Sequence, residues 1–325
     1  MILRESEGEL VKLEISAPSL ASAFIRDLYA RMFLTRLVDD CVQRLCVRLS
    51  CECVVSCRGH EAAQVGSAVC VEVGKDFTLP YYRDLGVVLT IGMTPEEVFR
   101  TYTQAYGKGG GQDVCTECNE QGRVNGIQEI PPWGYHKHNM VTGSTPVATH
   151  VLHAAGIAFA SKLRKAAVVT VAYCGDGATA EPDFLEGITF AAQHQLPVVV
   201  VCEQDEDASS LHSLPLPSHL EYNCIDGTDV VAVYEAMHTA MQYAREGRGP
   251  VLLAMNVHRF SPAELSTEEE RRNDPLWRCQ QYMQERGLWD EAWAAQLQTR
   301  LTCEVEQAMY HASGDKQRVE EQYSV

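Results

Sequence analysis

The chain has 325 residues, of which 46% are hydrophobic and 22% charged, and its formal net charge at pH 7 is −17. Such a chain is long enough to bury a large core, either as one large α/β domain or as two ordinary ones. The negative charge argues against a nucleic-acid partner, because proteins bind phosphate backbones mainly through Lys and Arg.

The N-terminal region, MILRESEGELVKLEI, is charged throughout and lacks the apolar core of a signal peptide. The longest apolar stretch, residues 196–202, is far too short to span a bilayer. We therefore expect a soluble, cytoplasmic protein with no membrane partner.

Two helices and a long loop are predicted in the first part of the chain. Residues 19–48 carry apolar side chains near helical spacing. A second helix is expected over residues 94–106, because Thr94 is a suitable N-cap and Pro95 suits the first helical position. Residues 107–134 are rich in Gly, Asn, Gln and Pro, which predicts a long irregular loop of the kind that is often functional.

The middle of the chain alternates between helices and strands. Helices are expected over residues 147–165, 183–193 and 229–245, and strands over residues 167–174, 198–202 and 250–255. Near-continuous β-branched runs separated by helices predict an α/β fold with a doubly wound, mostly parallel sheet covered on both faces.

A charged helical tail follows from residue 266, with Trp277, Trp289 and Trp293 as expected packing anchors. We therefore expect an N-terminal extension over residues 1–18, one domain over residues 19–265, and a C-terminal helical tail over residues 266–325 that packs on the same domain.

The chain has thirteen cysteines, most of them inside apolar runs, where Cys acts as a small buried hydrophobe. Cys51, Cys53 and Cys57 form one cluster, and Cys115 and Cys118 form a Cys-x-x-Cys pair. A zinc site needs a second, properly spaced pair nearby, which the sequence does not show. Reduced thiols are the favoured interpretation, and zinc is the alternative.

The segment CGDGA, residues 174–178, follows a predicted strand and precedes a predicted helix. Ligands bind at the carboxyl ends of parallel strands, where a helix N-terminus offers N–H groups to an anion. Asp176 is placed to hold a magnesium ion that bridges to a diphosphate. Taken alone, the same residues are also typical of an ordinary connection between a strand and a helix.

The longer stretch GDGATAEPDFLEGITFAAQHQLPVVVVCEQDED resembles the thiamine diphosphate motif, in which a metal-binding Asn follows GDG by about thirty residues; here Asp205 stands 29 residues after Asp176. The segments RGHEAAQVGSA, PYYRDLGVVLTIGMTPEEVF and HNMVTGSTPVATHVLHAAGIAFASKL resemble the same family in the same order. The chain from about residue 25 is thus similar to the alpha subunit of the thiamine-diphosphate-dependent, decarboxylating component of 2-oxo acid dehydrogenase complexes. The segments RGLWDEAW and STPVATH are closest to the branched-chain type.

This resemblance implies a site that binds thiamine diphosphate and Mg²⁺ between an alpha and a beta subunit of an α2β2 heterotetramer. It implies decarboxylation of a 2-oxo acid and acyl transfer to a lipoyl group on a partner acyltransferase. The implied cofactor-binding residues are Tyr82, Arg83, Thr145, Val147, Gly175, Gly177 and Ala178, and the implied metal ligands are Asp176, Asp205 and Asp207. A potassium-binding turn of some relatives matches Ser144, Pro146, Thr149 and His150.

The sequence departs from the family at the second strand. Relatives carry Asn-Asn there and, two residues later, an aromatic residue, whereas this chain has EQDED from Glu203 to Asp207. Asp205 can still ligate magnesium, and the carbonyl of Asp207 can replace that of the aromatic residue. We expect four acids in this run to face the diphosphate, at a cost on the order of kcal/mol each.

A second departure follows the last strand, where the resemblance implies two adjacent histidines, one of which assists acyl transfer. Pro262 and Ala263 stand there instead, so no catalytic residue is assigned in this chain. His258 is a conceivable substitute, but a histidine at a strand end is more often structural. The sequence therefore predicts the alpha subunit of a 3-methyl-2-oxobutanoate (branched-chain 2-oxo acid) dehydrogenase or, as the alternative, a catalytically impaired pseudoenzyme subunit with a structural or regulatory role.

Overall fold

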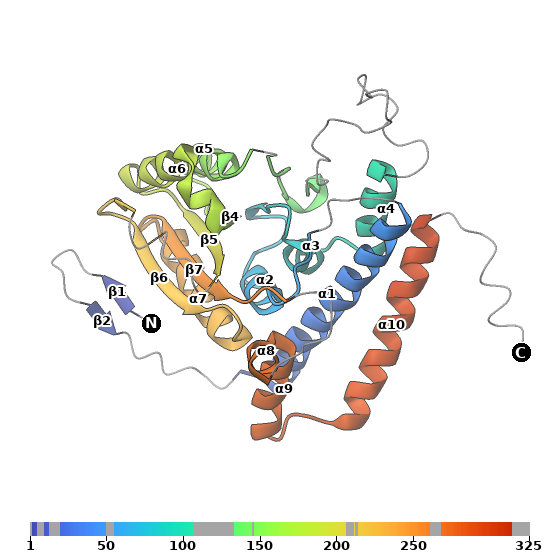
Figure 1. The fold of residues 1–325 in the computed structure, drawn as a ribbon. Coiled ribbons are helices and arrows are strands. Elements are labelled where there is room, and N and C mark those ends of the chain that lie inside the picture. The colour runs from blue at the N-terminus through green and yellow to red at the C-terminus, as the bar shows by residue number, and fades with distance from the viewer. Residues whose placement is uncertain are drawn as a thin grey trace, which may run out of the picture.

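The computed structural model describes residues 2–4, 10–12, 20–49, 55–106, 133–144, 146–205, 211, 214–260 and 268–313. Its centre is a five-stranded sheet in which every neighbouring pair is parallel, in the order β3-β4-β5-β7-β6 (Figure 1). The strands are β3 (Phe77–Leu79), β4 (Thr170–Gly175), β5 (Val198–Asp205), β6 (Glu221–Asp226) and β7 (Val251–Val257).

Helices cover both faces of this sheet. On one face lie α5 (Thr149–Leu163) and α6 (Pro182–Gln193), and on the other α2 (Glu61–Ala68), α3 (Leu85–Ile91) and α7 (Val230–Arg245) (Figure 1). Side chains of β5 alternate between the two cores, because successive strand residues point to opposite faces: Val199 and Val201 join the α2–α7 side, whereas Val200 and Cys202 join the α5–α6 side. The predicted doubly wound fold is confirmed.

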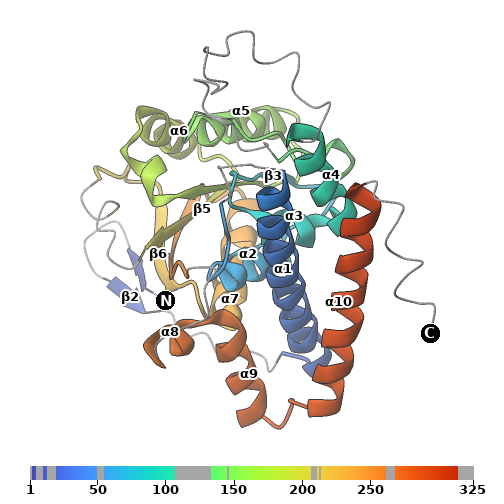
Figure 2. The same cartoon turned by 45° about the vertical axis from the view of Figure 1, so that its right-hand side comes forward.

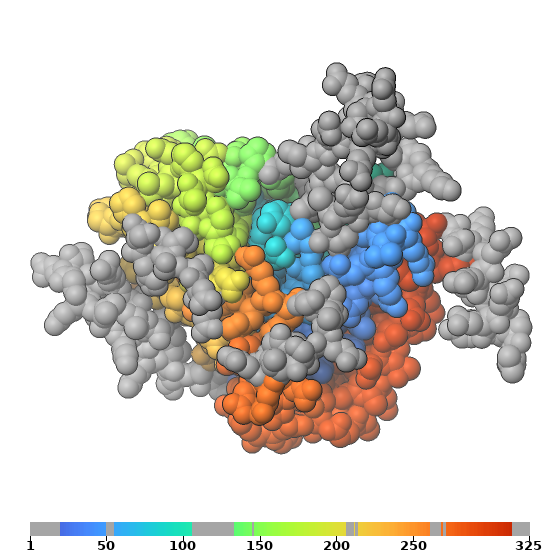
Figure 3. Space-filling view, in the orientation of Figure 1, coloured from blue at the N-terminus to red at the C-terminus, as the bar shows by residue number. Residues whose placement is uncertain are grey.

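A third group of helices lies outside the α2–α7 layer. It comprises α1 (Ser22–Arg48), α4 (Pro95–Tyr106), α8 (Glu268–Asn273), α9 (Pro275–Glu285) and α10 (Glu291–Ser313). The first helix and the last lie side by side (Figure 2), and in the space-filling view they form the blue and red flank of the molecule (Figure 3). Two short strands, β1 (Ile2–Arg4) and β2 (Leu10–Lys12), pair antiparallel near the N-terminus.

The predicted helices and strands are present, with ends shifted by a few residues. The first turn of α4 forms the expected cap: Glu97 N–H donates to Thr94 Oγ1 (3.2 Å), and Thr94 N–H donates to Glu97 Oε2 (2.8 Å). Sequence reasoning missed β3, which has only three residues, and β6, an edge strand whose side chains are mostly half-buried or exposed.

Two of the three expected tryptophan anchors pack as predicted. Trp289 and Trp293 lie with ring centroids 5.2 and 5.9 Å from that of Tyr29 on α1, whereas Trp277 borders an open hollow. Most of the predicted loop over residues 107–134, the Cys51, Cys53, Cys115 and Cys118 positions, and both predicted domain boundaries lie outside the described residues, so these predictions stay open. Within the described part of the chain, no helix is long and apolar enough to cross a membrane.

Candidate cofactor site

A cavity of about 310 Å³ opens at the carboxyl ends of β3 and β4, where a doubly wound sheet binds its ligands. Four separate segments build its wall. They contribute Tyr81, Tyr82 and Arg83 after β3; Ser144, Val147 and His150 at the start of α5; Cys174, Gly175, Asp176, Gly177, Ala178 and Glu181 between β4 and α6; and Arg259 after β7.

Seven of the ten predicted cofactor and metal residues line this cavity: Tyr82, Arg83, Val147, Gly175, Asp176, Gly177 and Ala178. Asp205 is the last residue of β5, paired in register with Val257, and is not among the lining residues. Thr145 and Asp207 lie outside the described residues, as do Pro262 and Ala263. The roles of all these residues stay predictions.

Two arginines from distant parts of the chain meet in the cavity. The Nη1 of Arg83 donates to the carbonyl of Ser56 (2.6 Å), and Ser56 Oγ in turn donates to the buried Asp39 (2.6 Å). On the other side, Arg259 Nη2 lies 3.1 Å from Asp176 Oδ1. Two permanently charged donor forks in one cavity suit a diphosphate.

The bend after β4 leaves room for a ligand. A Cβ placed on Gly177 would meet no other heavy atom within 4 Å, so this backbone borders open space. Asp176 Oδ1 accepts from the Gly177 N–H (3.0 Å) and from Arg259, and its Oδ2 has no hydrogen bond among the described residues. A carboxylate oxygen in a cavity that two arginines also line fits a divalent cation that bridges to a phosphate group.

The acidic run that begins at the end of β5 does not face the cavity as a whole, which corrects the expectation for its first residue. Glu203 has no exposed surface and lies beneath the cavity, where its Oε2 accepts hydrogen bonds from Tyr81 Oη (2.8 Å), Gln64 Nε2 (3.2 Å) and His60 Nδ1 (2.6 Å). Glu203 lies on the same face of β5 as Val199 and Val201, two residues before the end of the strand, so the core on the α2–α7 side covers it.

A second carboxyl group lies beside Glu203. Burial and the charge of Glu203 raise the pKa of Asp84 well above its usual range, and the two carboxyl groups share a hydrogen bond. Asp84 Oδ1 and Glu203 Oε1 have no other partner among the described residues. A proton carried by Asp84 and donated to Glu203 satisfies both oxygen atoms. Sequence reasoning missed this cluster, although its members lie in segments that carry the resemblance.

Side chains at the start of α5 form hydrogen bonds with neighbouring elements. Thr149 Oγ1 donates to Asp183 Oδ2 (2.6 Å), and His150 Nε2 lies 2.5 Å from the carbonyl oxygen of Tyr173. Burial lowers the pKa of His150, so its ring is neutral at pH 7 and Nε2–H is the donor. The His150 side chain therefore brings no oxygen ligand to the predicted potassium-binding turn, whereas Ser144, Pro146 and Thr149 carry hydroxyl or carbonyl oxygens, and the potassium prediction stays open.

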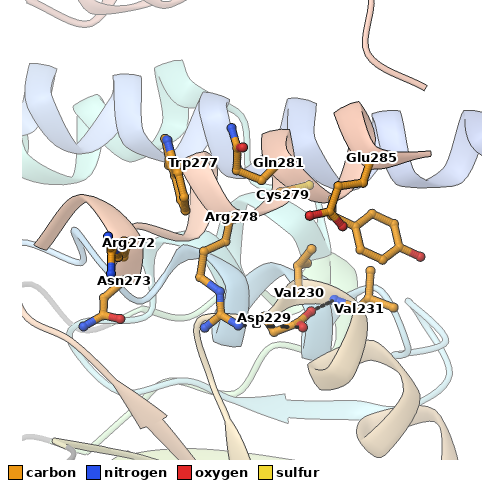
Figure 4. A pocket seen from close by; sticks show the side chains of 11 residues that line it. Asp229, Val230, Val231, Arg272, Asn273, Trp277, Arg278, Cys279, Gln281 and Glu285 are labelled. Carbon is orange, nitrogen blue, oxygen red and sulfur yellow. Dashed lines mark hydrogen bonds and ion pairs between the residues drawn. The ribbon is translucent and has the colours of Figure 1, made fainter. Parts of the chain in front are cut away.

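A larger hollow of about 580 Å³ lies between the start of α7 and the helices α8 and α9 (Figure 4). Its central arginine, Arg278, is already paired with carboxylates. Arg278 pairs with Asp226 (2.5 Å) and lies 3.9 Å from Asp229, which caps α7 through the Val231 N–H (2.9 Å). None of the predicted site residues lines it, so the smaller cavity is the better candidate site.

Comparison with known proteins points the same way as the cavity. A family model described as the dehydrogenase E1 component matches residues 29–212 and 221–320. The 2-oxoisovalerate dehydrogenase subunit alpha of Bacillus subtilis is 33% identical over 81% of this chain and 82% of its own length. The 3-methyl-2-oxobutanoate dehydrogenase subunit alpha of Mycobacterium tuberculosis is 31% identical over 85% of this chain and 75% of its own length. The pyruvate dehydrogenase E1 component subunit alpha of Acholeplasma laidlawii is 31% identical over 76% of this chain and 71% of its own length.

Proposed function

We propose, starting from the fact that this chain belongs to the dehydrogenase E1 component family, that it is the alpha subunit of a thiamine-diphosphate-dependent dehydrogenase acting on branched-chain 2-oxo acids. The observation that carries the proposal is the convergence of seven predicted residues on one cavity at the carboxyl end of the sheet. The substrate class follows from the branched-chain relatives, each more than 30% identical over most of the chain.

The chain's own contribution is to bind and orient the cofactor. Arg83 and Arg259 would neutralise the diphosphate, and Asp176 would hold Mg²⁺ beside it. Val147 and Tyr82 offer apolar surface at the mouth of the cavity, where they are 48% and 39% exposed. Thiamine diphosphate, when bound, supplies the chemistry that releases carbon dioxide from a 2-oxo acid.

We assign Mg²⁺ to Asp176 together with Asp205 and the carbonyl of Asp207. Carboxylate and carbonyl oxygens are the ligands that this cation prefers. A potassium ion at the turn before α5 stays a prediction, for which Ser144, Pro146 and Thr149 would supply the oxygen ligands.

Exposed apolar side chains along α5, which begins at the cavity wall, support a beta subunit as the partner. Val147, Leu152 and Leu163 are 48%, 39% and 69% exposed, and all lie on α5 or in the turn before it. A helix that is apolar on its outer face as well as its inner face is normally covered in the assembled protein. A beta subunit on this face would border the cavity and complete the site of an α2β2 enzyme, and a lipoyl-bearing acyltransferase would accept the acyl group in the cytoplasm.

Calorimetric titration of thiamine diphosphate and magnesium into the chain co-purified with its beta partner tests the proposal. We expect micromolar binding that is lost in Asp176→Ala and kept in Asp27→Ala, which changes an exposed aspartate on α1 that pairs with Arg31 (2.7 Å). Turnover of branched-chain 2-oxo acids is expected in the same preparation. No binding to an intact heterotetramer would contradict the catalytic proposal and leave a fold kept for assembly.

A further inference from the structure

We infer that Glu203 is a positioning residue: it holds the turn between β3 and α3, residues 80–84, in the shape that presents Tyr82 and Arg83 to a diphosphate. The identity of the ligand rests on the proposed function, whereas the ordering of the turn rests on the structure alone. Glu203 itself does not line the cavity.

One carboxylate oxygen of Glu203 gathers donors from two different elements. Its Oε2 accepts from His60 and Gln64, which belong to the start of α2, and from the hydroxyl of Tyr81, which belongs to the turn. His60, Gln64 and Glu203 have no exposed surface. Removing this acceptor would take a hydrogen bond from each of three buried donors, which costs far more than the loss of one exposed hydrogen bond.

Two buried side chains, Gln64 and Asp84, hold the backbone of the turn. Gln64 Nε2 also donates to the carbonyl of Arg83 (3.1 Å), and Gln64 Oε1 accepts from the Gly86 N–H (2.9 Å). At the start of the turn, the Tyr81 N–H donates to Asp84 Oδ2 (2.7 Å). The backbone on both sides of Tyr82 is therefore fixed by buried side chains.

Glu203 also lies next to the predicted metal end of the site. It shares one face of β5 with Asp205 and precedes it by two residues, one step deeper in the pleat. The Tyr81 ring lines the cavity, and its Cε2 is 3.6 Å from where a Cβ on Gly175 would stand. A single buried carboxylate thus links the turn that carries Arg83 to the strand end that carries Asp205.

A purely structural role for this cluster would lower stability without changing how the cofactor binds. Tyr81→Phe separates the two roles, because it removes one hydroxyl and keeps the ring. The matched control is Tyr243→Phe, which removes a tyrosine–glutamate hydrogen bond of 3.2 Å to Glu221 between α7 and β6. Both variants are made in the chain co-expressed with its beta partner.

Two measurements decide the outcome. Amide hydrogen exchange without cofactor should be faster across residues 80–86 in Tyr81→Phe and unchanged there in Tyr243→Phe. The KM for thiamine diphosphate, at fixed magnesium, should rise about tenfold in Tyr81→Phe, because a hydrogen bond to a charged group is worth at least about a factor of ten. The kcat at saturating cofactor should stay within about twofold of the wild-type value.

The conservative variant provides the rescue. Glu203→Gln keeps an acceptor for the donors and should stay within about threefold of the wild-type KM, whereas Glu203→Met should raise the KM at least as much as Tyr81→Phe. Equal exchange across residues 80–86 in the two tyrosine variants overturns the inference, and so does a lowered kcat with an unchanged KM. A wild-type enzyme that binds no cofactor contradicts the proposed function instead, and the exchange comparison then decides the ordering of the turn.

Discussion

Replacing Arg36 with methionine should cost this protein a large part of its stability. Arg36 lies on α1 and joins two carboxylates: Glu61 on α2, through Nε (2.5 Å), and Asp274, at the start of α9, through Nη2 (3.0 Å) and Nη1 (3.2 Å). The side chains of Arg36, Glu61 and Asp274 are only 10%, 0% and 7% exposed. Methionine fills a similar volume but leaves two buried carboxylates without their cation.

Removing one partner of a buried ion pair typically costs about 3–5 kcal/mol. At about 2.1 cal/mol/K of unfolding entropy per residue, a chain of 325 residues loses about 4–7 °C of Tm for that change. Differential scanning calorimetry of the chain with its beta partner measures the shift. Arg31→Met is the control, because Arg31 pairs with Asp27 on the same helix while the two side chains are 39% and 49% exposed, and such pairs contribute at most about 1 kcal/mol. Equal shifts in the two variants would refute the reasoning.

Three further outcomes are expected. Burial tends to raise the pKa of Glu97, but hydrogen bonds from Thr94 and from the Tyr135 hydroxyl outweigh it and lower this pKa. A carboxyl group whose pKa is lowered in the folded state stabilises the protein above the pKa of the unfolded state, which is about 4.3 for Glu. Glu97→Ala should therefore cost about 1 kcal/mol of unfolding free energy at pH 7, and thermal melts should show this difference shrinking as the pH falls below about 4.3. Gly59→Ala should lower Tm more than Gly247→Ala, since both have positive φ (+95° and +74°) but only the Cβ on Gly59 would come within 1.8 Å of the His258 carbonyl oxygen. Burial raises the pKa of Cys70 to about 12, so iodoacetamide at pH 8 should leave this thiol unmodified in the native protein, as read by mass spectrometry.

The sequence predicted the parts of the fold whose signals are local. The apolar runs of β4, β5 and β7 and the cap of α4 are each specified by neighbouring residues, and they formed where expected. The edge strand β6 was missed because its half-buried polar residues carry no clear alternation.

The candidate site was predictable to a similar extent. Its motif residues meet in one cavity because strand ends of a parallel sheet gather at one edge. The orientation of Glu203 was predicted wrongly, since the acidic run was read as a single exposed patch, whereas Glu203 lies two residues before the end of β5 and is fully buried. The pairing of Glu203 with Asp84, 119 positions apart in the numbering, depends on tertiary packing that no local pattern encodes.

The attachment of the C-terminal helices to α1 has a consequence for how the chain folds during synthesis. Arg26 donates to the carbonyl of Leu288, and Arg36 reaches Asp274, so α1 finds these partners 262 and 238 residues later in the chain. At about 5–20 residues per second, the ribosome needs about 12–48 s to travel from Arg36 to Asp274. For that interval the apolar stripe of α1 lacks its final cover, which makes the newly made chain a natural client for chaperones that shield exposed helices.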